Sequence, residues 1–340
     1  MKVVNWAILA PGRIAHKMAE AMKKTSGKIK LNLYAVGSRD LERAKQFAEK
    51  WGFEKAYGSY KDLLSDPKVD AVYVANPHSF HFESVMACLE AGKHVLCEKP
   101  AACNLFQLNK MIEKAKEKKL FFMEAMWTAF NPCIQKIKKV IAEGKIGEIK
   151  HIESDFSGRF PFDLKSRSWA PELAGGALLD LGVYNIFYSM IINNFEPIVK
   201  HTSSVRMRNG VDAWNSVNLI FKNGVTAHFQ SSIDIPSLTN SHDAVIFGSK
   251  GFIKSTNFNR QEKAEVHVYT GDAYSYSNLV EEIKAPFDVN GFEYQVIDAT
   301  ECILNGKIES DVHTFQHSID LCKMMDTLRN DWGFKYPFEK

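Results

Sequence analysis

The sequence predicts an α/β protein in two parts: a doubly wound parallel sheet, then an α+β domain with a large, mostly antiparallel open sheet. In the first 125 residues, short apolar runs alternate with amphipathic helical patterns, and this order produces parallel strands joined by right-handed crossovers. After residue 148, short strands follow one another through tight turns, which produces antiparallel pairing. We therefore place one domain at residues 1–125 and another at residues 126–340, with the last helices as candidates to pack back on the first.

The first domain is predicted from its hydrophobic periodicity. Residues 40–51 show it most clearly, because Leu41, Ala44, Phe47 and Ala48 share one helical face. Strands are predicted at residues 3–9, 30–36, 70–75, 94–97 and 120–123. Helices are predicted between them at residues 13–24, 40–51, 80–91 and 105–118.

The second domain is predicted from strands and turns. Asn223-Gly224 and Lys250-Gly251 stand where hairpin turns are expected. The predicted strands are residues 149–157, 216–221, 225–232, 244–247, 252–255 and 264–269. Two helices, at residues 292–304 and 314–330, close the chain.

Composition excludes several classes of protein. The 43 basic and 40 acidic residues leave a formal net charge of +3, which gives no support to nucleic-acid or membrane-surface binding. The 6 cysteines form no CxxC pair, so a zinc ribbon or a secreted disulfide framework is not expected. The apolar run from Val3 to Ala10 leads into a turn and is interpreted as a strand, not a signal peptide. We find no apolar stretch of membrane-spanning length and expect a cytoplasmic protein.

The turn after the first strand has the position of a dinucleotide-binding fingerprint. It reads Ala10-Pro11-Gly12-Arg13-Ile14-Ala15, and only the middle glycine of GxGxxG is kept. Gly12 is the glycine whose missing side chain lets the backbone approach a pyrophosphate at a helix N-terminus. We predict that Ala10, Gly12, Arg13 and Ile14 bind the cofactor, although a plain strand–turn–helix explains so weak a motif too.

The end of the second strand bears on which dinucleotide binds. NAD sites usually place a carboxylate there for the ribose 2′-hydroxyl, whereas this chain has Gly37-Ser38-Arg39-Asp40. Ser38 and Arg39 suit a 2′-phosphate, and Asp40 is placed to cap the following helix. The sequence favours NADP, with NAD as the alternative.

Two further stretches indicate the chemistry. Glu98-Lys99-Pro100 follows a buried strand and so lies at the carboxyl edge of the sheet, where ligands bind. Asp180 and Tyr184 are four residues apart and project from one face of a helix. Oxidation of an alcohol requires a base at the hydroxyl. A phenol, whose ordinary pKa is about 10, can serve when a lysine ammonium lies close to it.

Together these residues resemble the glucose–fructose oxidoreductase / inositol dehydrogenase (Gfo/Idh/MocA) family, and within it the dihydrodiol dehydrogenase and NADP-dependent D-xylose dehydrogenase branch. The resemblance covers nearly the whole chain. It is carried by residues 37–40, Asn76-Pro77-His78 with His81, residues 91–95, Glu98-Lys99-Pro100, residues 123–127 and residues 175–184.

The resemblance implies a Rossmann domain and a hydride transfer between nicotinamide and a hydroxyl-bearing carbon of a sugar or cyclic trans-diol. It implies that Lys99 and Tyr184 are the reactive pair and that Asp180 assists them. It also implies a homodimer that packs through the second sheet. Apolar residues make that sheet a candidate interface, although some of them must face the internal core: Val217, Leu219, Val225, Ala227 and Phe229. The further residues that it places against cofactor are Asn76, Pro77, His78, His81, Glu98, Lys99 and Pro100. Those that it places against substrate are Trp127, Phe156 and Asp180.

Alternatives remain open at this stage. Taken singly, Lys99, Asp180 and Tyr184 could be an ordinary loop lysine, a helix N-terminal charge and a core aromatic. The chain could be an aldose–ketose oxidoreductase with a tightly held cofactor, or a sensor that binds NADP and a sugar without turnover. Ala129 stands where related sequences have arginine, so no substrate is transferred from them. No metal site is expected, and His313 and His317 are interpreted as an exposed helix face.

Overall fold

The computed structural model describes residues 3–237, 242–271 and 276–339. The chain forms two compact units, Met1–Trp127 with Asp288–Lys323, and Thr128–Phe287 with Met324–Lys340. The first of the two closing helices therefore belongs to the first unit, together with the beginning of the second.

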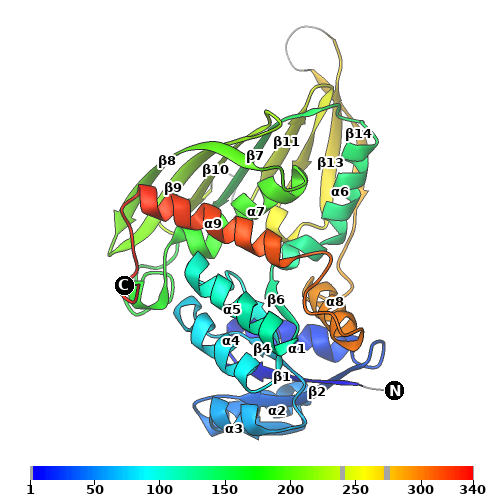
Figure 1. The fold of residues 1–340 in the computed structure, drawn as a ribbon. Coiled ribbons are helices and arrows are strands. Elements are labelled where there is room, and N and C mark those ends of the chain that lie inside the picture. The colour runs from blue at the N-terminus through cyan, green and yellow to red at the C-terminus, as the bar shows by residue number, and fades with distance from the viewer. Residues whose placement is uncertain (1–2, 238–241, 272–275, 340) are drawn as a thin grey trace. The chain divides into compact units, whose positions relative to one another are not determined.

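The first unit contains a parallel sheet, as the sequence predicted, and this sheet has six strands (Figure 1). The strand order is β3-β2-β1-β4-β5-β6, the order of a dinucleotide-binding doubly wound sheet. The short strand β3 was not predicted, because three residues are too few to show a period. The strands are β1 (Val4–Leu9), β2 (Leu31–Gly37), β3 (Lys55–Tyr57), β4 (Ala71–Val74), β5 (His94–Glu98) and β6 (Phe122–Ala125).

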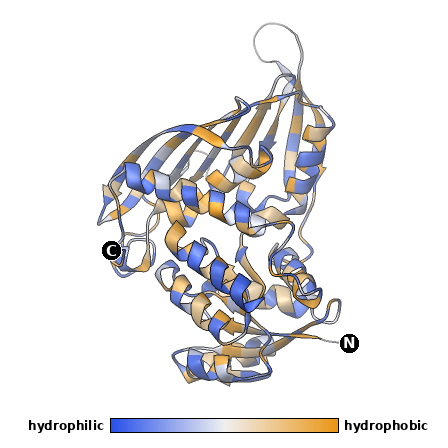
Figure 2. Ribbon diagram, viewed as in Figure 1, coloured by the Kyte–Doolittle hydropathy of each residue, from blue (hydrophilic) through white to orange (hydrophobic). Residues whose placement is uncertain are grey.

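Helices cover this sheet, and the outer side of α5 is strongly hydrophilic in Figure 2. Helix α8 packs against α1, β1 and β5. Trp6 in β1 donates from Nε1 to Thr300 Oγ1 of α8 at 3.1 Å, so the C-terminal segment is tied to the centre of the sheet. The helices are α1 (Arg13–Thr25), α2 (Leu41–Trp51), α3 (Tyr60–Ser65), η1 (His78–Phe80), α4 (His81–Glu90), α5 (Leu105–Lys118) and α8 (Glu293–Leu304).

The second unit contains an eight-stranded sheet in the order β14-β13-β12-β11-β7-β10-β9-β8. All neighbouring pairs are antiparallel except β7 and β10, which confirms a mostly antiparallel sheet. The edge strands β8 and β14 were not predicted, because they bury too few side chains to alternate clearly. The strands are β7 (Ile149–Ser157), β8 (Ile198–Arg208), β9 (Val211–Phe221), β10 (Thr226–Ser232), β11 (Ala244–Gly248), β12 (Gly251–Ser255), β13 (Lys263–Tyr269) and β14 (Ser277–Lys284).

One face of this sheet is covered by helices. Helix α7 packs against β7 and β10, and α6 packs against β13 and β14 (Figure 1). The five residues proposed from the sequence as interface residues are all buried within the single chain. That interface prediction is wrong, because alternation along β9 and β10 turns these side chains to the covered face. The remaining helices of this unit are η2 (Trp127–Phe130, at the boundary), α6 (Pro132–Ala142), η3 (Pro171–Leu173), η4 (Leu178–Gly182), α7 (Val183–Ile192), η5 (Phe258–Arg260) and α9 (Phe315–Asp331, shared with the first unit).

One helical segment is, against expectation, long and apolar enough to cross a membrane. Pro171–Ile192 spans 22 residues with a mean hydropathy of 1.3 in its most apolar window, and that window is wholly buried. A buried core helix has these properties without any membrane. All six cysteine side chains are likewise buried.

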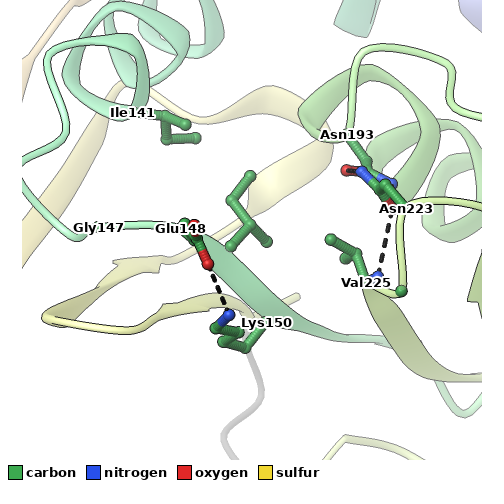
Figure 3. Close-up of a pocket in the computed structure, with 9 residues that line it drawn as sticks. Ile141, Gly147, Glu148, Lys150, Asn193, Asn223 and Val225 are labelled. Carbon is green, nitrogen blue, oxygen red and sulfur yellow. Dashed lines mark hydrogen bonds and ion pairs between the residues drawn. The ribbon is translucent and has the colours of Figure 1, made fainter.

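A surface hollow of about 650 Å³ lies at the start of β7 and not at the predicted site. Figure 3 shows Ile141 of α6, Glu148 and Lys150, and Asn223 and Val225 around it. Phe156, the β7 residue predicted to contact substrate, is seven residues beyond Ile149, the first residue of the strand. At 3.3 Å per residue this separation is about 23 Å. We therefore assign no catalytic role to this hollow.

A buried carboxylate fixes the edge of the first sheet. Asp66, just after α3, accepts hydrogen bonds from the Tyr34 hydroxyl at 2.9 Å, the Tyr57 hydroxyl and the Lys55 ammonium at 2.9 Å. Burial acts to raise the pKa of the Asp66 carboxyl, but these donors outweigh burial and hold the pKa well below its usual range.

We predict that Asp66→Asn lowers the free energy of unfolding at pH 7 by about 2 kcal/mol, because the variant loses charge-assisted hydrogen bonds. A carboxyl with a depressed folded-state pKa contributes its full stabilisation above the unfolded value of about 4 and loses it progressively as pH falls from there towards the folded value. The difference between wild type and variant should therefore shrink below pH 4 in urea titrations. The exposed Asp62→Asn in α3 is the control, and a pH-independent difference for Asp66→Asn would contradict the account.

Candidate active site

The turn after β1 leaves room above Gly12. Ala10 adopts φ 68°, the left-handed region in which the fingerprint's first glycine would be unstrained. A Cβ on Gly12 would meet only Ala10 O and Ala75 O, both at 3.9 Å. The chain itself therefore does not require glycine here, whereas a close ligand would. Gly12 begins α1 without a side-chain cap, so the first N–H groups of α1 are available to an anion.

The end of β2 presents cations. Asp40 is committed to α2, because its Oδ1 accepts from the backbone N–H groups of Glu42 and Arg43 at 3.0 and 3.2 Å. This geometry confirms the predicted cap. Ser38 is buried, and its Oγ accepts from Asp40 N at 3.2 Å. Arg39 is exposed.

Arg43 is a residue that the sequence analysis missed. Its guanidinium donates to Pro11 O at 3.0 Å and so lies beside the glycine turn. Burial raises the pKa of Tyr60, while the charges of Arg39 and Arg43 lower it, which places both arginines near the same phenol. A hollow of about 470 Å³ borders this region, lined by Pro11, Gly12, Arg13, His16, Arg43, Gln46, Phe47 and Lys50. Its charged lining is entirely basic.

His81 ties together the loops that follow β4 and β5. It is fully buried, with Nε2 2.8 Å from Asn76 O and Nδ1 2.8 Å from Pro100 O. Burial lowers the pKa of His81, and the charge of Lys99 acts in the same direction. The geometry shows a link between two loops, and contact of His81 with a cofactor stays a prediction. His78, also buried, lies edge-on to His81 with ring centroids 5.6 Å apart.

The side-chain amide of Asn76 is hydrogen-bonded, whereas its side-chain oxygen is not, within the part of the chain that the structure describes. Its amide donates to Ser84 Oγ at 2.7 Å, while its buried Oδ1 has no hydrogen-bond partner among the described residues. A ligand hydroxyl would satisfy this oxygen. Pro77 next to it is half-buried.

Lys99 lies in a fixed turn at the end of β5. Glu98 is buried and accepts a hydrogen bond from the Tyr73 hydroxyl. The Lys99–Pro100 peptide bond is cis, and Ala101 N donates to Glu124 Oε1 at 2.9 Å. The Lys99 side chain is itself mostly buried. Neighbouring strands thus fix the backbone on both sides of Lys99.

Glu124 lies beside His313, and the sequence-based interpretation of His313 as an exposed helix residue is wrong. His313 is buried, not on an exposed helix face, and its Nε2 lies 3.1 Å from Glu124 Oε2. Ser318 donates to the same oxygen at 2.8 Å. Burial acts to raise the pKa of Glu124, but His313, Ala101 N–H and Ser318 together lower it. No group of metal-ligating side chains occurs in the part of the chain that the structure describes.

In the second unit, Asp180 is held by Arg167. The guanidinium approaches both carboxylate oxygens, at 3.1 and 3.0 Å. Asp180 is buried while Arg167 is nearly half exposed, so the pair presents donors to solvent. Asp180 lies on the π-helical turn η4, and such turns are frequent at functional sites. The sequence analysis assigned no role to Arg167.

Tyr184, on the first turn of α7, lies among aromatic rings. Its ring centroid is 5.5 Å from that of Phe156, which stacks on His242 at 3.8 Å. Burial lowers the pKa of His242. In the first unit, Trp127 packs against Phe292 at 4.6 Å. The structure thus brings Tyr184 and Phe156 together, and it adds His242, which no sequence motif indicated.

Comparison with known proteins identifies the family. Residues 4–126 match the family described as "Oxidoreductase family, NAD-binding Rossmann fold" and residues 134–254 match the "GFO/IDH/MocA C-terminal domain". The chain is 32% identical over 339 residues to the trans-1,2-dihydrobenzene-1,2-diol dehydrogenase of Homo sapiens, covering 99% of each. It is 32% identical over 344 residues to the enzyme of that name from Xenopus laevis, covering 98% of this chain and 99% of the relative. The chain therefore belongs to the Gfo/Idh/MocA family of oxidoreductases.

Solved structures share the fold. The 3-ketoreductase KijD10 from Actinomadura kijaniata, in complex with NADP and TDP-benzene, aligns with a TM-score of 0.84 at 24% identity, over 97% of this chain and 98% of that one. Levoglucosan dehydrogenase with NADH and L-sorbose aligns with a TM-score of 0.84 at 18% identity, over 98% and 97%. The family model and the relatives at 32% identity show that the protein is an oxidoreductase with an NAD(P)-binding Rossmann domain, as predicted.

Proposed function

We propose that this protein is an NADP-dependent dehydrogenase that transfers a hydride between nicotinamide and a hydroxyl-bearing carbon of a sugar or cyclic trans-diol. The observation that carries the choice of cofactor is the commitment of Asp40 to the cap of α2. The cap holds this carboxylate at the first turn of α2, and the groups beside it, Arg39 and Arg43, are cations that attract a 2′-phosphate.

The residues present fit such a cofactor. Gly12 leaves space for a pyrophosphate at the N-terminus of α1, and Asn76 Oδ1 is an unused buried acceptor. When bound, the nicotinamide supplies the hydride acceptor or donor, and the protein supplies binding and proton transfer. His81 holds the loops after β4 and β5 at the edge where such ligands bind.

For the chemistry, we assign Tyr184 as the general base towards the substrate hydroxyl and Lys99 as the cation that favours its phenolate form. A base at the hydroxyl is required because the oxygen loses its proton as the carbon loses hydride. Asp180 has both oxygens engaged by Arg167, so we assign it the role of a fixed acceptor for a substrate hydroxyl. Arg167 holds it in place.

The substrate class rests on the relatives and on the aromatic lining. The curated relatives are named for a cyclic trans-diol, and one fold relative was solved with a sugar. Phe156, Tyr184 and His242 offer ring faces, which suit a small cyclic molecule. We place this reaction in the cytoplasm, where six buried thiols stay reduced.

The two alternatives from the sequence predict different behaviour in one assay. An aldose–ketose oxidoreductase would purify with its cofactor and show no net change in nicotinamide absorbance. A sensor would bind NADP and a sugar without turnover. The proposed dehydrogenase should instead show continuous reduction of free NADP with a member of a sugar and diol panel.

We predict that the wild type binds NADP more tightly than NAD. We also predict that Arg39→Ala or Arg43→Ala reduces the ratio of the Kd for NAD to the Kd for NADP, because NADP binding weakens. Each change removes a phosphate contact that is worth about 1.5–3 kcal/mol, or roughly ten- to a hundredfold in Kd. Isothermal titration calorimetry with NADP and with NAD measures both Kd values. Lys23→Ala, in the last turn of α1, is the control. Equal wild-type Kd values for NADP and NAD would contradict the NADP assignment.

We predict that Tyr184→Phe lowers kcat by about 10²–10⁴, the usual contribution of a general base. The Kd for NADP should hardly change, because only one oxygen is removed. Lys99→Met should also lower kcat, and the double variant should lose less than the product of the two losses, because the groups act as a unit. Near-normal turnover of Tyr184→Phe, with hydride transfer rate-limiting, would remove Tyr184 from the mechanism.

We also propose a homodimer through the uncovered face of the second sheet. That face carries stacked rings, among them Phe252 on His267 at 4.5 Å and His151 on Phe247 at 6.1 Å. Strands β9 and β10 of the same sheet carry neutral polar side chains such as Ser216 and Gln230, and Glu153 Oε2 lies 3.4 Å from His151 Nε2. Rings with few lysines at the centre are typical of an interface, and a second copy would cover them symmetrically.

Light scattering with size-exclusion chromatography at micromolar concentration should give a dimer of this 38.5 kDa chain. Phe252→Asp should give a monomer, because a charge at the centre of an apolar contact is costly when it is desolvated. Lys284→Ala, on an exposed side chain of the edge strand β14, is the control. A monomeric wild type would contradict the dimer.

A further inference from the structure

The helix that carries Asp180 and Tyr184 begins at a tightly enclosed turn. Gly175 N donates to Ala170 O at 3.1 Å, and Gly176 N donates to Ser168 O at 3.0 Å. A Cβ on Gly175 would lie 2.7 Å from Ser168 O, and Gly176 has φ +117°. Both glycines are therefore required by the backbone path, and the turn has little room to shift.

A fully buried carboxyl group closes this turn from β9. Asp212 Oδ2 accepts from the backbone N–H of Leu178 at 2.7 Å and from the amide of Asn215 at 2.9 Å. Leu178 is the first residue of η4, so the first of these bonds holds the beginning of the helix. Neither the sequence motifs nor the proposed mechanism uses Asp212.

The other oxygen of Asp212 is in a poor place for a negative charge. Oδ1 is buried and has no hydrogen-bond partner among the described residues. It faces the backbone of Gly176, where an added Cβ would lie 2.1 Å from it. A buried oxygen without donors is costly to ionise, whereas a neutral carboxyl can still accept both bonds through Oδ2.

We propose that Asp212 in its neutral form is a positioning residue that holds the first turn of the helix bearing Asp180 and Tyr184, and that its ionisation loosens this turn. The part of this inference that concerns Asp180 and Tyr184 rests on the proposed function. The anchoring of Leu178 does not.

The charges around Asp212 agree with this assignment. Burial raises the pKa of its carboxyl to about 7, although Leu178 N–H, the Asn215 amide, the backbone N–H of Asp212 itself and the charge of Arg329 on α9 lower it. The Arg329 guanidinium is engaged elsewhere, with Glu339 at 2.6 Å and Asp326 at 2.9 Å. Because the pKa lies near neutrality, the anchor changes within the pH range in which enzymes work.

The sign of the effect follows from proton linkage. An aspartate in a solvated, opened turn has a pKa of about 3.9, lower than that of Asp212 in the closed turn. The closed turn therefore binds the proton more tightly, and its advantage over the opened turn falls as pH rises towards and through 7. Between pH 6 and pH 8 the ratio of opened to closed turn should rise about tenfold, from these two pKa values.

Hydrogen exchange at the Leu178 amide tests the anchor directly. After correction for the intrinsic pH dependence of exchange, protection of the wild-type amide should be about tenfold lower at pH 8 than at pH 6. Asp212→Asn keeps an oxygen for Leu178 but cannot ionise, so its protection should stay constant. Asp331→Asn, exposed on α9 in the same unit, should behave as the wild type. The wild-type measurement decides the proposal even if Asp212→Asn fails to fold. Constant protection of the wild-type Leu178 amide from pH 6 to pH 8 would overturn the proposal that ionisation of Asp212 loosens this turn.

Turnover tests the positioning role. The kcat of Asp212→Asn divided by that of wild type should rise from pH 6 to pH 8, by no more than tenfold, while the Kd for NADP stays unchanged. Taking the ratio cancels the titration of Lys99 and Tyr184, which both proteins share. A flat ratio beside the expected exchange result would overturn the positioning role. Near-normal kcat of Tyr184→Phe, together with the expected tenfold change in protection of the Leu178 amide, would instead count against the proposed function and leave the anchor of Leu178 intact.

Discussion

The site depends first on the two contacts of His81 with backbone carbonyls. Asn76 O and Pro100 O each lie 2.8 Å from a ring nitrogen, and they belong to loops that follow neighbouring parallel strands. Carbonyl oxygens only accept, so an imidazole satisfies both only by donating through both nitrogens. Burial, which lowers the pKa of His81, opposes the second proton. The two hydrogen bonds to the ring therefore favour the doubly protonated imidazole, whereas burial disfavours it. Lys99 directly precedes Pro100, whose carbonyl accepts one of these bonds.

The buried carboxyl groups of each unit differ in the donors that they receive. Glu124 has three donors and is held ionised beside His313, so it fixes Ala101 and the backbone after Lys99. Asp180 is neutralised by the bidentate Arg167. Asp212 has too few donors for its burial and keeps its proton up to neutral pH. Donor count and burial thus decide which carboxyl groups carry charge, and charge decides what each can do for a substrate hydroxyl.

The sequence was sufficient for the strands that bury an apolar face, such as β1 and β7, and for the cap at Asp40. Periodicity could not show β8, where no side chain is buried, and it could not tell that Val217 and Phe229 both lie on the covered face of their sheet. Contacts between distant residues left no local signal. Arg43 meets Pro11 across 32 residues, Asp212 meets Leu178 across 34, and His313 meets Glu124 across 189. Only the fold brings these partners together.

The central claim is that hydride passes between nicotinamide and a hydroxyl-bearing carbon of the substrate. The most direct test uses a sugar or cyclic trans-diol that supports turnover, deuterated at its carbinol carbons, with NADP. Mass spectrometry of the reduced cofactor should show one deuterium on the nicotinamide ring for each oxidised substrate molecule. Reduced cofactor without deuterium, or oxidised product without reduced cofactor, would contradict the account.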